Sequence, residues 1–131
     1  MASEYTHTPV TVEGKTAVII GGTSGIGRGI ARGFAADGAD VVATSRSESK
    51  VADAAEELRS LGAETVEITC DVTDRESIAA LGEAVFDAFG DVDVLVNSGG
   101  AVAREGVLDV TDEQWDDVFA VQLDGVYRAT Q

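Results

Sequence analysis

The chain has 131 residues, the length of one domain that can bury roughly two thirds of the surface of its unfolded chain. Its 24 acidic residues against 9 basic ones give a formal net charge of −15. So large a negative excess argues against nucleic acid and anionic membranes as partners, because both bind positively charged proteins. The acidity and the scarcity of lysine favour a cytoplasm with high salt, although an ordinary acidic, soluble protein has the same composition.

Cysteine and histidine occur once each, as Cys70 and His7, so we expect neither a disulfide framework nor a metal site. Residues 1–9 form a polar leader that contains Glu4 and no apolar core, so we expect no secretory signal. No apolar stretch approaches the length of a membrane span. The sequence therefore predicts a cytoplasmic protein with one domain over residues 10–131.

Residues 15–27 are the most informative segment, because a buried strand there runs into a glycine-rich turn that opens a helix. The β-branched run 18–20 is typical of a parallel strand covered on both faces. Apolar residues then change to helical spacing at Ile26, Ile30 and Phe34. A helix that starts there directs its free N–H groups and positive dipole end beyond the strand, where a pyrophosphate is the natural ligand.

The glycines of this turn are Gly21, Gly25 and Gly27, and their spacing is G-x-x-x-G-x-G. The common dinucleotide fingerprint G-x-G-x-x-G is not satisfied in any frame. Without a Cβ, the first can turn the chain, the second lets the backbone approach a ligand, and the third allows close helix packing. The alternative is that this segment is only a structural strand-to-helix turn that binds no ligand.

This pattern resembles T-G-x-x-x-G-I-G of the classical short-chain dehydrogenase/reductase family, with Ile20 in place of its Thr. The resemblance implies an NAD(P)-binding Rossmann domain. The turn residues that would bind the cofactor are Gly21, Thr23, Ser24, Gly25, Ile26 and Gly27.

The rest of the chain alternates predicted strands and helices. Strands are predicted at 41–45, 65–70 and 93–96, and helices at 51–58, at 78–89 and from Thr111, which caps its helix with Gln114. Such alternation predicts an α/β fold with a doubly wound parallel sheet. Ligands bind such sheets at the carboxyl ends of the strands, where the glycine turn lies.

The end of the second strand indicates which cofactor is bound. Enzymes that use NAD commonly place an acid there, about 20 residues after the glycines, to bind the adenosine ribose. This chain has Ser45 followed by Arg46, and a guanidinium can grip the 2′-phosphate that a carboxylate would repel. NADP(H) is therefore favoured over NAD(H). The alternative is that Arg46 is merely a solvated charge. Arg28 is a second candidate cation, and Ser24 replaces a basic residue that is common in NADP-dependent members.

Two later segments extend the resemblance. By similarity, Asp71 would accept a hydrogen bond from the adenine amino group and Val72 would pack against the ring, although Asp71 could also cap the next helix. Residues 97–100, Asn-Ser-Gly-Gly, resemble the family's Asn-Asn-Ala-Gly. The small residues Ser98 and Gly99 should let the backbone pass close to the cofactor's ribose, and the resemblance implies that Asn97 and Gly99 bind the cofactor.

The family's catalytic residues are mostly absent from this sequence. The resemblance implies a Tyr that protonates a carbonyl, a Lys four residues later, a Ser and a relay Asn. No Tyr-x-x-x-Lys occurs here, since Pro9 and Gln131 stand four residues after the two tyrosines. Residues 121–125, Val-Gln-Leu-Asp-Gly, resemble the family's Val-Asn-Leu-x-Gly, so Gln122 stands at the relay position as the candidate catalytic residue. Its amide has the same donors and acceptors, so it either serves the relay or the relay is absent.

We interpret the chain as the N-terminal, cofactor-binding half of such an enzyme, truncated after the fourth strand and the start of the following helix. The implied reaction is reversible reduction of a carbonyl to a secondary alcohol on a small-molecule substrate. The resemblance also implies a homo-oligomer, often a tetramer. The alternative is an NADP-binding protein without catalysis. An extended-type epimerase or dehydratase expects G-x-x-G-x-x-G, which Arg28 interrupts.

Overall fold

The computed structural model describes residues 8–131 and contains a parallel sheet of three strands. β1 (Thr16–Ile20) lies between β2 (Asp40–Thr44) and β3 (Val94–Asn97). Ile19 is in register with Ala43 on one side and Val96 on the other. Most of the predicted leader, including Glu4 and His7, lies outside the described residues.

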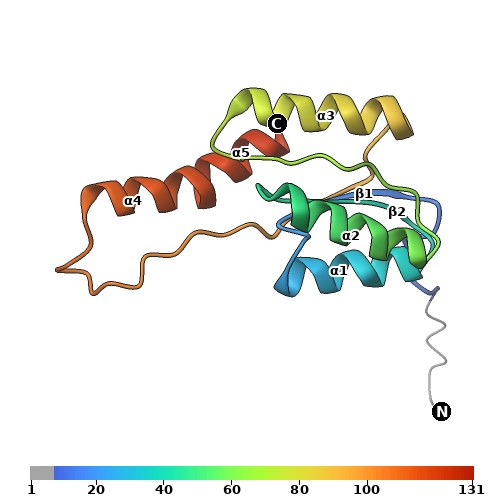
Figure 1. Ribbon diagram of the computed structural model, residues 1–131, viewed down its shortest axis with the longest axis horizontal. Coiled ribbons are helices and arrows are strands. Elements are labelled where there is room, and N and C mark those ends of the chain that lie inside the picture. Colours follow the sequence, from blue (N-terminus) through green and yellow to red (C-terminus); the bar gives the residue numbers. More distant parts are fainter. Residues whose placement is uncertain (1–7) are drawn as a thin grey trace, which may run out of the picture.

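Helices follow the strands in chain order (Figure 1). They are α1 (Gly25–Ala36), α2 (Glu48–Ser60), α3 (Arg75–Phe89), α4 (Asp112–Phe119) and α5 (Val126–Thr130), with a π-helical segment, η1 (Ala120–Gly125), between the last two. Within residues 8–131, no helix is both long and apolar enough to cross a membrane.

Helices cover both faces of the sheet, so the predicted doubly wound fold is confirmed (Figure 1). On one face, α1 and α2 pack on the strands in a buried cluster that includes Ile19, Ala35 and Leu58. On the other face, α3 and α5 pack around a second cluster that includes Val18 and Val85. Since successive strand residues point to opposite faces, β1 contributes to both clusters, which explains why it is apolar throughout.

The predicted strand at 65–70 is wrong, because the structure has no strand there. An extended segment instead runs beside β2 and is held at its two ends. The Val41 N–H donates to the Glu64 carbonyl at 3.2 Å, and the Cys70 N–H donates to the Ser45 carbonyl at 3.0 Å. Between them the Thr44 hydroxyl donates to the Ile68 carbonyl at 2.6 Å. A side chain thus replaces the backbone pairing that a strand ladder requires.

Local capping signals explain where two helices begin. Thr111 caps α4, and Thr111 and Gln114 form the predicted capping box. α3 is capped by Asp74, whose carboxylate accepts the Glu76 N–H at 2.9 Å. The alternative that Asp71 caps this helix is therefore wrong.

Apolar side chains stay exposed along α4, η1 and α5. Trp115 and Phe119 stack with their ring centroids 4.9 Å apart, and Leu123 and Tyr127 continue the exposed apolar surface.

Candidate cofactor-binding site

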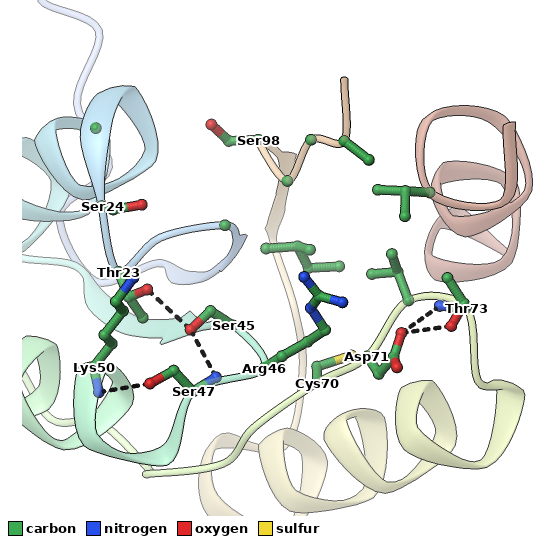
Figure 2. A pocket seen from close by; sticks show the side chains of 18 of the residues that line it. Thr23, Ser24, Ser45, Arg46, Ser47, Lys50, Cys70, Asp71, Thr73 and Ser98 are labelled. Carbon is green, nitrogen blue, oxygen red and sulfur yellow. Dashed lines mark hydrogen bonds between the residues drawn. The ribbon is translucent and has the colours of Figure 1, made fainter. Parts of the chain in front are cut away.

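A cleft of about 880 Å³ opens at the carboxyl ends of the strands (Figure 2). Its walls come from the turns after β1 and β2, the first turns of α1 and α2, the segment that precedes α3, the loop after β3, and the helices α4 and η1. A volume of this size is within the range of small-molecule and cofactor sites, and its position is the one that parallel sheets use for ligands.

The turn after β1 is packed so closely that side chains do not fit. A Cβ on Gly21, whose φ is +77°, would lie 2.5 Å from the backbone nitrogen of Gly99. A Cβ on Gly27 would lie 2.1 Å from the carbonyl oxygen of Gly21. The start of α1 therefore packs directly on the turn, and the turn packs on the loop after β3. Gly25, with φ of +55°, has no atom within 4 Å of its Cβ position apart from its own helical turn, so this backbone is open for a ligand to approach.

The first turn of α1 faces the cleft with unused polar groups. Ser24 is the N-cap residue, but its hydroxyl makes no capping hydrogen bond and lines the cleft. The N–H groups of a first helical turn have no partner within the helix and carry the positive end of its dipole. Ile26 is 81% exposed beside them, whereas Ile30 and Phe34 pack against the core. This arrangement is suited to bind an anion with an apolar surface next to it.

The end of β2 has no carboxylate. The Ser45 hydroxyl accepts a hydrogen bond from the Thr23 hydroxyl at 2.9 Å, and the Ser47 N–H lies 3.4 Å from the same oxygen. Arg46 is exposed and points into the cleft, and Lys50, from the first turn of α2, also lines it (Figure 2). Neither cation forms an ion pair with any residue that the structure describes.

Arg28 is bound elsewhere. Its guanidinium lies 2.7 Å from the Glu57 carboxylate, to which Arg32 also donates, and Arg28 is absent from the cleft wall. These two arginines lower the pKa of Glu57, Arg32 more than Arg28. Arg28, the second candidate for binding the 2′-phosphate, is thus held in an ion pair between α1 and α2.

On the α3 side of the cleft, Asp71 is a fixed acceptor. Its Oδ1 accepts from the Thr73 hydroxyl at 2.7 Å and from the Thr73 N–H at 2.9 Å. These bonds, with a smaller contribution from the charge of Arg46, lower the pKa of Asp71, so the carboxylate stays ionised at neutral pH. Beside it, burial raises the pKa of the Cys70 thiol, which therefore remains protonated. Val72 lines the same wall, where a Cβ on Gly125 would lie 2.8 Å from its Cγ2.

Most of the residues selected from the sequence line the cleft, and three do not. Gly21, Thr23, Ser24, Gly25, Ile26, Ser45, Arg46, Asp71, Val72 and Gly99 form its wall. Gly27 lies behind the turn. The Asn97 amide points away and donates to the Thr130 hydroxyl at 3.4 Å, so its neighbour Ser98 takes the place at the wall.

Gln122 is the third residue outside the wall. It lies in η1, and its amide Nε2 donates to the carbonyl oxygen of Ala101 at 3.0 Å. Ala101 itself lines the cleft. The candidate relay residue is therefore separated from the cleft by one residue of the loop after β3, within a π-helical turn, a feature frequent at functional sites.

Sequence reasoning missed several residues of the wall. They are Ile20, Ser47, Lys50, Cys70, Thr73, Gly100, Ala101, Asp117 and Val121. Lys50 and Ser47 could have been found from their position in the turn and first helical turn after Arg46. Asp117 and Val121 carry no local signal, because only the tertiary structure brings α4 and η1 to the cleft.

Comparison with known proteins agrees with this geometry. Residues 15–131 match the short chain dehydrogenase family model. The chain is 39% identical over 122 residues to the (5R,7aS)-5-hydroxy-7a-methyl-1-oxo-2,3,5,6,7,7a-hexahydro-1H-indene-carboxyl-CoA reductase of Mycobacterium tuberculosis, covering 92% of this chain and 47% of that protein. It is 38% identical over 120 residues to a 3-oxoacyl-acyl-carrier-protein reductase of Haemophilus influenzae, covering 92% and 48%.

Among solved structures, a short chain dehydrogenase/reductase from Burkholderia phymatum in complex with NAD superposes with a TM-score of 0.87 at 33% identity, covering 93% of this chain and 43% of that one. The chain spans about half the length of the curated relatives it matches. With its parallel sheet, glycine turn and cleft, the chain belongs to the short-chain dehydrogenase family.

Proposed function

We propose that the intact protein is an NADP(H)-dependent oxidoreductase that interconverts a small-molecule carbonyl and a secondary alcohol. The observation that supports the choice of cofactor is the end of β2, where Ser45 stands in place of an acid and Arg46 reaches into the cleft. The family supports hydride transfer with a nicotinamide cofactor. The preference for NADP(H) rests on the charges of this cleft.

The charge distribution supports this preference. A 2′-phosphate monoester carries about −1.5 to −2 charges at pH 7. In a chain of net charge −15, Arg46 and Lys50 are cations without a carboxylate partner among the described residues, both on the cleft wall. A planar guanidinium can donate two parallel hydrogen bonds to a phosphate. A ribose that ends in a 2′-hydroxyl gains little from either cation.

The remaining parts of the cofactor have matching surfaces. The first turn of α1 and the open backbone at Gly25 would bind the pyrophosphate. Asp71 would accept a hydrogen bond from the adenine amino group, since the carboxylate is ionised and its Oδ1 is already oriented by Thr73. Val72 would pack against the ring. Ser98, Gly99 and Gly100 would lie beside the ribose that carries the nicotinamide.

The chemistry needs residues that this sequence does not contain. The bound cofactor supplies or accepts the hydride. A proton donor such as the family's Tyr, lowered in pKa by a Lys, would complete the reduction, but the 131 residues include no Tyr-x-x-x-Lys. Of the family's catalytic positions, this chain contributes Gln122, which would hold the proton relay through its amide. We therefore expect the 131 residues alone to lack oxidoreductase activity, and the intact protein to act as a homo-oligomer in the cytoplasm.

A second candidate function is binding of NADP(H) without catalysis. It is favoured by one observation, the hydrogen bond from the Gln122 amide to the Ala101 carbonyl, which engages one of the two N–H donors of this amide. The two functions differ in turnover. Consumption of NADPH by the intact protein in the presence of a panel of ketones and acyl thioesters supports the enzyme, and tight binding without consumption supports the binding protein.

Titration of the intact protein with NADPH and NADH tests the cofactor assignment. The protein should bind NADPH at least about tenfold more tightly, the lower end of the effect expected for hydrogen bonds to a charged group. Equal affinity for the two cofactors would contradict the assignment from Ser45 and Arg46.

A further inference from the structure

The proposed function counts the charge of Lys50 at the cleft but does not say which part of the cofactor Lys50 would bind. It is in the first turn of α2, and its N–H donates to the Ser47 hydroxyl at 3.4 Å, which ties its backbone to the turn after β2. Figure 2 shows its side chain on the same side of the cleft as Thr23 and Ser45. The ammonium group therefore approaches the end of β2 from the helix, whereas Arg46 approaches it from the strand.

Among the residues that the structure describes, Lys50 has no oppositely charged partner. The chain has two lysines, and the other, Lys15, lies 3.7 Å from the Asp93 carboxylate. Within residues 8–131, Lys50 makes no ion pair. The acidic residues of the cleft wall are Asp71 and Asp117, on the segment before α3 and on α4. The edge at Ser45 thus presents two cations to the cleft in a strongly acidic molecule, and such cations attract an anion.

We propose that Lys50 is a second specificity-determining residue, which binds the 2′-phosphate of NADP(H) together with Arg46, an inference that rests on the proposed function. A phosphate of nearly two negative charges is balanced by two cations rather than one. The two side chains contribute differently, because a guanidinium presents a planar fork and an ammonium is a compact charge with three donors. The hydroxyl of Ser47 lies between them in the chain and is also on the wall.

The alternative ligand for Lys50 is the pyrophosphate, which NADH and NADPH share. The structure favours the 2′-phosphate, because the pyrophosphate surface belongs to the first turn of α1, whereas Lys50 is on α2 and is tied to the turn after β2. The two ligands predict different results with the two cofactors, so the choice can be tested.

The test is calorimetric titration of the intact protein and of two variants, Lys50→Gln and Lys15→Gln, with NADPH and with NADH in matched salt. Lys50→Gln should weaken NADPH binding by roughly three- to tenfold. This loss of affinity lies between that expected for a screened surface ion pair and that for a full charge-assisted hydrogen bond. NADH binding should change by less than about twofold. Lys15→Gln removes the same charge away from the cleft, so it should leave both affinities unchanged.

Each outcome distinguishes the inference from the proposed function. Equal weakening of NADH and NADPH by Lys50→Gln would assign Lys50 to the pyrophosphate and overturn the inference. Unchanged NADPH binding would overturn it as well, while a parent protein that still prefers NADPH would leave the proposed function standing. The side chain of Lys50 is exposed, so we expect its substitution to leave the fold intact. Unchanged NADH binding would show that the variant is folded.

Discussion

Replacing Arg46 by Ala tests the reasoning about the cofactor most directly. A hydrogen bond to a charged group contributes about 1.5–3 kcal/mol. Arg46 is exposed at the mouth of the cleft, so solvent and salt screen its charge and the lower end of that range applies. About 1.5 kcal/mol corresponds to roughly a tenfold loss of NADPH affinity. NADH lacks the 2′-phosphate, so its affinity should stay nearly unchanged.

The assay is fluorescence or calorimetric titration of both cofactors against the parent, Arg46→Ala and Arg59→Ala. Arg59 is a matched control, since it is in the last turn of α2 and lies 3.0 Å from Glu67, away from the cleft wall. A third variant, Ser45→Asp, should weaken NADPH further and offer NADH a ribose acceptor, while Thr23 can still donate to the new carboxylate. If Arg46→Ala weakened NADH as much as NADPH, Arg46 would not be a 2′-phosphate ligand.

Three further predictions concern the relay, the turn and the α1–α2 ion pair. Gln122→Asn should keep the activity of the intact enzyme within about tenfold of the parent's, whereas Gln122→Ala should reduce it by a factor of about 10² or more. If the Ala variant were as active as the parent, Gln122 would have no role in the relay. Gly27→Ala should lower the free energy of unfolding in urea by about 1–3 kcal/mol, because its Cβ would meet the Gly21 carbonyl oxygen, while Gly29→Ala, with no atom within 4 Å, should not destabilise the protein. The ion pairs lower the pKa of Glu57, so they stabilise the fold at pH values above the ordinary Glu pKa of about 4.3, and this stability is lost as the pH falls further. Glu57→Gln should therefore flatten the acid side of a curve of unfolding free energy against pH. Identical curves for the variant and the parent would refute this.

The strand β1, the glycine turn after it and the start of α4 could be predicted from the sequence alone. The run of β-branched residues in β1 requires burial on both faces, and the structure buries all five residues of that strand. Gly21 adopts a positive φ that other residues avoid, and the capping pair Thr111 and Gln114 forms within three residues of chain. These features depend on neighbours in the sequence, so they can be predicted without knowing the fold.

Only the tertiary structure decided which side chains meet at the cleft. Arg28 is drawn away by Glu57, 29 residues later in the chain, and Asn97 turns toward Thr130, 33 residues later. In the segment 65–70, the Ile68 carbonyl accepts the hydroxyl of Thr44, 24 residues earlier, and the segment forms no strand. In each case the contact is made with a residue distant in the sequence, so it cannot be predicted from the pattern of neighbouring residues.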